Sequence, residues 1–133
     1  MRIFVATFLG VIAAFICILL LEPLGNLLFP LPFKIDPENA VAQLKENSHL
    51  IPIGSFISVL FVHAVAIFIG LFVARLIEKE SKIPLYILAV FLLYGTVANL
   101  FMVPHPIWFS IADILIQSII GLLFIMKVKT KTS

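Results

Sequence analysis

The sequence predicts an all-α membrane protein: an antiparallel four-transmembrane-helix bundle with one short interfacial helix in the first external loop. Four long apolar runs fill most of the 133 residues, of which 62% are hydrophobic and only 12% are charged. The mean hydropathy of +1.22 lies outside the range of soluble domains. We expect a single membrane domain, 1–133, because four crossing helices leave room only for short connections and one longer loop.

The first transmembrane helix is predicted at about 3–21. This run contains no charged residue, and as a helix it would span roughly 28 Å, close to the hydrocarbon thickness of a bilayer. A cleaved signal peptide is the competing interpretation, because Arg2 precedes the run. The run is longer than the usual apolar core of a signal peptide, about 7 to 15 residues, and no Ala-x-Ala site follows it. A retained helix is therefore favoured.

The first external loop is predicted at 22–51. Its proline-rich beginning, 22–33, is expected to be extended rather than helical. Asp36 suits a helix N-cap and Pro37 the first helical position, so a short amphipathic helix is predicted at about 37–47. With apolar residues on one face and charged residues on the other, this helix is expected to lie on the membrane or to cap the bundle.

The remaining transmembrane helices follow in the second half of the chain. A charged stretch, 75–82, separates the second from the third, and Pro104-His105-Pro106 forms a tight turn before the fourth, because two prolines flanking one residue cannot continue a helix. The three helices and the tail are predicted at about 52–77, 84–103, 106–126 and 127–133.

The distribution of basic residues predicts the orientation in the membrane. Seven of the nine lie on one side of the predicted topology, and Lys34 and Lys45 lie on the other. By the positive-inside rule, both termini and the 75–82 turn are cytoplasmic, and the long loop and the Pro-His-Pro turn face outward. The seven residues are Arg2, Arg75, Lys79, Lys82, Lys127, Lys129 and Lys131.

Polar residues inside the apolar runs are the functional candidates, because they are costly to bury in lipid. Ser110, Asp113, Gln117 and Gly121 follow helical i, i+3, i+4 spacing, so their stripe must face protein or water. His63 lies near the middle of the second run, at nearly the depth of Gln117. Almost all of the polarity falls in the outer half, which predicts a polar cleft open to the outside. Its candidate residues are Glu22, His63, Thr96, Asn99, His105, Asp113 and Gln117.

Two interpretations of these residues remain open. Asp113 or His63 could exchange protons or coordinate a cation, or the group could hydrogen-bond across helices and hold them in register. A metal site is not expected, because the three histidines come from different elements and lack the spacing of metal ligands. The serines lack a nucleophile motif, so neither an enzyme nor a cofactor is predicted. The basic residues are explained by topology and not by nucleic-acid binding.

Small residues repeat at four-residue intervals in the first two runs. Such stripes allow helices to pack closely. The stripe in the first run suits either an internal contact or a homodimer interface, and the internal contact is favoured. The two stripes are Ala6, Gly10 and Ala14, and Ala66, Gly70 and Ala74.

The stretch Ala98-Asn99-Leu100-Phe101-Met102-Val103-Pro104-His105-Pro106-Ile107-Trp108-Phe109, followed by Asp113, resembles a family of small four-helix bacterial membrane proteins. The resemblance extends to Glu22 at the end of the first helix and to the Pro30-Leu31-Pro32 loop. It covers most of the chain. It implies a location in the bacterial inner membrane, but it brings no activity.

Three functions are compatible with these residues. The first is an interaction or accessory subunit of a membrane assembly, which the Pro-rich loop and the scarcity of ionisable residues favour. The second is a small oligomeric proton- or ion-coupled carrier or channel that uses Asp113 and His63. The third, an enzyme acting on a lipid-borne substrate, needs catalytic groups that the sequence does not display. The expected partners are membrane lipids and further membrane-protein subunits, either copies of this chain or a larger assembly.

Overall fold

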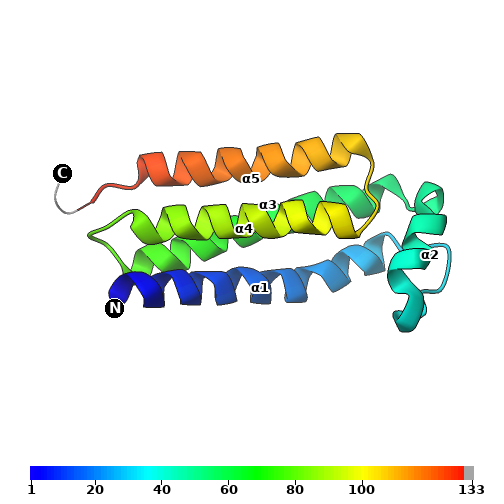
Figure 1. Ribbon diagram of the computed structural model, residues 1–133, viewed down its shortest axis with the longest axis horizontal. Coiled ribbons are helices and arrows are strands. Elements are labelled where there is room, and N and C mark those ends of the chain that lie inside the picture. Colours follow the sequence, from blue (N-terminus) through cyan, green and yellow to red (C-terminus); the bar gives the residue numbers. More distant parts are fainter. Residues whose placement is uncertain (131–133) are drawn as a thin grey trace.

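Four long helices run side by side in alternating directions in the computed structural model, which describes residues 1–130 (Figure 1). Within those residues the fold is entirely helical, and each of the four helices is long and apolar enough to cross a membrane. The predicted fold class is thus confirmed. The helices are α1 (Arg2–Leu28), α3 (Ile53–Ile77), α4 (Ile83–Met102) and α5 (Ile107–Lys127).

The two ends of the bundle differ. The N-terminus, the turn between α3 and α4, and the end of α5 lie together at one end, called here the terminal end (Figure 1). The opposite end carries the loop between α1 and α3 with the short helix α2 (Ala40–Glu46), and is called the α2 end. Lys131, which contributes to the predicted charge bias, lies outside the described residues.

Helix α1 is longer than the sequence predicts. It continues through Pro23 to Leu28, so the expectation that 22–33 is extended is wrong for its first half. Pro23 lacks the N–H of a regular helix, but membrane helices tolerate proline where neighbouring helices support them. Here Gly25 is buried against α3, and a Cβ atom on it would lie only 2.6 Å from Ser58 Oγ. This close packing maintains the helix beyond the proline.

The two stripes of small residues meet between α1 and α3. A Cβ atom on Gly10 would lie 2.8 Å from the carbonyl oxygen of Gly70, so only glycine allows this approach. The pair α1 and α3 has the most extensive contact of any two helices. The internal contact predicted for these stripes is confirmed, which leaves no small-residue stripe on the outside of α1 for a homodimer.

The short helix predicted at about 37–47 is divided into a 3-10 turn and α2, and a further 3-10 turn lies beyond it. A 3-10 turn, Pro37–Asn39, precedes α2, and a second one, Ser48–Leu50, follows it. Asp36 caps the first turn, since its carboxylate accepts a hydrogen bond of 3.2 Å from the backbone N–H of Glu38. None of the residues of α2 is buried.

The starts and ends of α3, α4 and α5 agree with the predicted runs to within one residue. Prolines and charged residues mark these bounds in the sequence.

The terminal half of the bundle holds the apolar core. The buried core cluster of this half is entirely apolar, whereas the buried polar residues of the spans, Thr96, Asp113 and Gln117, lie nearer the α2 end, as the sequence predicts. The core consists of Ala6, Ile67, Leu71, Ala74, Leu85, Leu88 and Ile125.

Polar contacts tie the connections together at the terminal end. The Arg75 guanidinium donates to the carbonyl oxygens of Glu78, at 3.2 Å, and of Lys129. The Glu78 carboxylate accepts from the backbone N–H groups of Glu80 at 2.7 Å and Ser81 at 3.1 Å. The Glu80 N–H is the largest cause of a pKa of Glu78 below its usual value, and burial opposes it.

Candidate functional site

A buried hydrogen-bond network joins three helices in the half of the bundle nearer the α2 end. Asp113 of α5 is only 1% exposed, and its carboxylate oxygens lie 3.0 and 2.9 Å from Nδ1 of His63 on α3. Gln117, one turn along α5, donates from Nε2 to Asp113 Oδ1 at 3.0 Å and to Thr96 Oγ1 on α4 at 2.6 Å. The stripe predicted on α5 therefore faces protein.

The network fixes the chemistry of the His63 ring. An ionised Asp113 carboxylate could only accept hydrogen bonds, and Nδ1 of His63 would then carry the proton of this contact. In the neutral ring the lone pair is then on Nε2. Because Asp113 lies behind the ring, its charge would also stabilise an imidazolium formed when Nε2 takes up a proton. The arrangement of carboxylate and imidazole can accept and release a proton at a defined atom.

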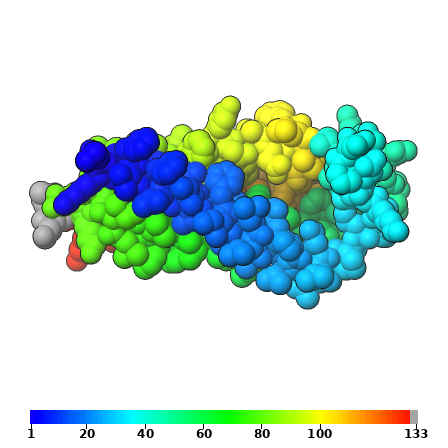
Figure 2. Space-filling model, turned by 90° about the horizontal axis from the view of Figure 1, so that it is seen from below, coloured from blue at the N-terminus to red at the C-terminus, as the bar shows by residue number. Residues whose placement is uncertain are grey.

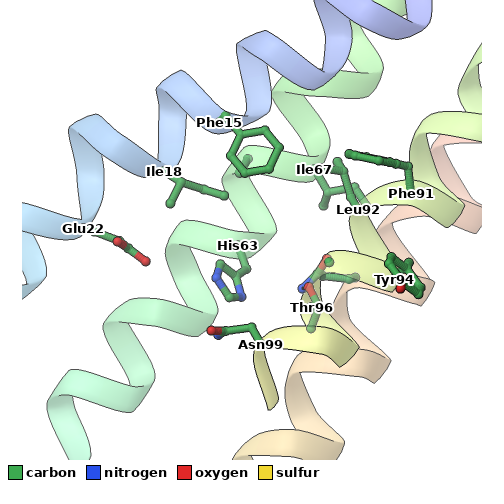
Figure 3. A pocket seen from close by; sticks show the side chains of 13 residues that line it. Phe15, Ile18, Glu22, His63, Ile67, Phe91, Leu92, Tyr94, Thr96 and Asn99 are labelled. Carbon is green, nitrogen blue, oxygen red and sulfur yellow. The ribbon is translucent and has the colours of Figure 1, made fainter. Parts of the chain in front are cut away.

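A cavity of about 430 Å³ lies beside the network, and all four long helices line it. Figure 2 shows it as a hollow in the side of the bundle between α1 and α4, with parts of α3 and α5 visible at the bottom. Figure 3 shows the His63 ring near the Asn99 side chain, with Glu22 of α1 to their left. Thr96 and Gln117 also line the wall, whereas Asp113 does not.

Aromatic side chains cover the network at the α2 end. Phe109, one turn before Asp113, is fully buried, the His105 ring stacks on it with a centroid distance of 4.8 Å, and Phe56 lies 5.4 Å from it. The cavity is hollowed into the side of the bundle between α1 and α4 (Figure 2), and an opening of the cleft toward the outside stays a prediction.

The seven predicted site residues fall into three groups. Four of them, all in the network, are bonded to one another, and Glu22 and Asn99 line the cavity beside them. His105 lies elsewhere, because its Nδ1–H donates to Val103 O at 2.7 Å and its ring faces a second cavity beside His49. Burial lowers the pKa of His105, and its hydrogen bond to Val103 opposes this shift.

Several residues of the cavity wall were not predicted. Phe15, Phe91 and Tyr94 line it together with Gly95. No signal in the sequence marks them, because an aromatic residue facing a cavity in a membrane helix has the same pattern as one facing lipid. Among the described residues, no group of three His, Cys, Asp or Glu side chains could hold a metal ion.

Comparisons with protein families, curated proteins and solved structures gave no match for this chain. The fold and the site define its class directly. It is a multi-pass membrane protein with four apolar helices and a polar network beside a lateral cavity.

Proposed function

We propose that this protein is a small proton- or ion-coupled carrier of the bacterial inner membrane, in which His63 and Asp113 exchange protons with the cavity. One observation carries the proposal: the His63 ring lines the cavity while its Nδ1 is held by the buried Asp113 carboxylate. Four helices enclose little space, so the carrier would work as an oligomer. The cytoplasmic location of both termini is supported by the excess of basic residues at the terminal end, where Arg2, Arg75, Lys79, Lys82, Lys127 and Lys129 lie, over Lys34 and Lys45 at the α2 end.

The proposed coupling follows from the position of the pair. Protonation of His63 at Nε2 would add a positive charge to the cavity wall. Asp113 does not line the cavity and would stay behind the His63 ring. A ligand that is sensitive to this charge would bind differently to the two protonation states, and by linkage its binding would take up or release a proton. Ionisable residues inside membrane helices are most often found on such pathways.

An interaction subunit is the second candidate. It is favoured by Gly95, where an added Cβ atom would meet nothing within 4 Å, because an open glycine on the side of α4 would allow a helix of another membrane protein to approach closely. In this case the hydrogen bonds of Asp113 and Gln117 would serve only to hold α3, α4 and α5 in register.

Proteoliposomes containing a pH-sensitive dye test the carrier. Inward gradients of Na⁺, K⁺ or an alkylammonium ion are imposed, and proton release from the lumen is recorded. We expect at least one cation to drive release through the wild type, and Asp113→Asn to slow it by about tenfold or more. Asp36→Asn is the matched control, because it makes the same chemical change in the exposed loop and asparagine caps helices as well as aspartate.

Two outcomes would overturn the carrier proposal. One is a wild type that moves no protons under any of the gradients, and the other is an Asp113→Asn variant as fast as Asp36→Asn. Native mass spectrometry of the detergent-extracted protein then tests the interaction subunit, which predicts a second protein species bound with fixed stoichiometry.

A further inference from the structure

The mouth of the cavity faces the space that lipid would occupy. Helix α1 packs much more extensively against α3 than against α4, and the seam between α1 and α4 is hollowed in the half nearer the α2 end (Figure 2). The aromatic cover formed by Phe56, His105 and Phe109 lies at the α2 end. A ligand could therefore reach His63 most directly from the side, out of the bilayer.

The cavity wall changes character with depth. Glu22 on α1 and Asn99 on α4 lie nearest the α2 end, while Phe15 and Phe91 lie roughly 10 to 12 Å deeper along the same two helices. The wall is thus polar toward the membrane surface and apolar toward the bilayer centre. A lipid molecule in the leaflet at the α2 end has the same polarity along its length.

The charge of the wall selects among head groups. Glu22 is the one acidic side chain in the lining, and the lining contains no lysine or arginine. An anionic head group such as a phosphate would meet a carboxylate and no basic partner, which is unfavourable in a partly dehydrated site. An ammonium head group would instead pair with Glu22, and its remaining contacts could go to Asn99.

We propose that the cavity binds an amphiphile with a cationic ammonium head and an apolar chain, which enters sideways between α1 and α4 from the leaflet at the α2 end. The head lies between Glu22 and His63, and the chain lies along Phe15 and Phe91. The cavity volume of about 430 Å³ is within the range of small-molecule sites, about 300 to 1,000 Å³.

This inference rests on the proposed function, and it explains how binding of the amphiphile would be coupled to release of the proton. A cationic head beside His63 and a proton on Nε2 of His63 would repel each other at this distance. Binding of the amphiphile would then favour release of the proton, and protonation would favour release of the amphiphile. Besides His63, the exchange uses the charge of Glu22, which pairs with the head, and that of Asp113, which holds Nδ1 of His63.

Photolabelling tests the inference without any transport. The full chain in phosphatidylglycerol nanodiscs is irradiated with a dodecyltrimethylammonium probe that carries a diazirine in its chain, and the labelled peptides are mapped. Label in the Phe15–Ile18 and Phe91–Leu92 segments is counted relative to label on the exposed face of α5. This ratio removes differences in how much probe enters the bilayer. Dodecyl phosphate with the same diazirine is the comparison probe.

Two variants and their controls sharpen the test. Glu22→Gln should lower the labelling ratio for the ammonium probe by about tenfold, the usual loss for one charged contact, while Glu38→Gln in the loop should leave it unchanged. Gly95→Leu should fill the mouth and abolish labelling of both segments. Val90→Leu is its control, because Val90 is exposed on the same helix outside the cavity.

Equal labelling of all lipid-facing helices would overturn the inference, as would equal ratios for the ammonium and phosphate probes. So would a dimer whose α1 and α4 crosslink between copies and exclude the probe. Retained labelling together with no proton movement in proteoliposomes would remove the proposed carrier but leave the binding site. Proton movement without labelling would remove the proposed binding site but leave the proposed carrier.

Discussion

The hydrogen bond between His63 and Asp113 should contribute measurably to stability. His63 Nδ1 lies 3.0 and 2.9 Å from the two carboxylate oxygens, and Asp113 is 1% exposed, so water cannot replace the contact. Hydrogen bonds to charged groups contribute about 1.5 to 3 kcal/mol in soluble proteins, whereas contacts between membrane helices average about 0.6 and reach about 1.7 kcal/mol. We therefore expect a coupling free energy of about 1 to 2 kcal/mol between the two side chains.

A double-mutant cycle isolates this coupling. The variants are His63→Gln, Asp113→Asn and the pair, and unfolding in mixed micelles is followed by circular dichroism as SDS is added at pH 7. The cycle cancels effects that each substitution has alone. The pair His49→Gln and Asp36→Asn in the exposed loop is the control and should show no coupling. A coupling indistinguishable from zero, or an Asp113→Asn variant more stable than the wild type, would refute an ionised Asp113 held by His63.

Three further predictions follow from the packing, the turn at the terminal end and the topology. Gly10→Ala should lower the free energy of unfolding by about 1 to 3 kcal/mol in the same SDS assay, because its Cβ would press on α3, whereas Gly95→Ala should not lower it. Since the pKa of Glu78 lies below its usual value of 4.5, its contribution is present above pH 4.5 and is lost as the pH falls through the folded pKa. Glu78→Gln should therefore be less stable than the wild type at neutral pH but not in acid, and equal stability at pH 7 would contradict this. An impermeant amine reagent on intact cells should label Lys34 and spare Lys79, and the opposite pattern would reverse the proposed topology.

The sequence predicts helices better than it predicts where α1 ends. Hydropathy and the flanking prolines and charges mark helix ends through local chemistry, which is why the bounds of α3, α4 and α5 could be predicted closely. Pro23 equally indicates the end of a helix by its local chemistry, but α1 continues past it to Leu28. The contact of Gly25 with α3 stabilises the helix there, and a contact between distant residues leaves no mark in the local pattern.

The residues of the candidate site could be predicted from local sequence patterns, but the direction in which the site opens could not. The four-residue spacing of Asp113 and Gln117 shows that they share a face of one helix, and helix depth brings His63 to their level. The direction of the opening depends on how each helix is rotated about its axis. That rotation depends on contacts between distant residues, such as the close packing of α1 against α3, which leave no mark in the local pattern.

The amide of Gln117 connects the proton site to the wall of the cavity. Its Nε2 donates both to Asp113 and to Thr96 on α4, and α4 is one of the two helices that border the mouth. Under the proposed function, protonation of His63 at Nε2 would strengthen its pairing with Asp113 and weaken the first bond, which frees the amide to reorient and alters its bond to α4. Thr96→Val removes the α4 contact and introduces no titratable group, so it should change photolabelling of the cavity and leave proton uptake at His63 intact. A Thr96→Val variant with wild-type labelling would show that the network holds the helices together without communicating with the cavity.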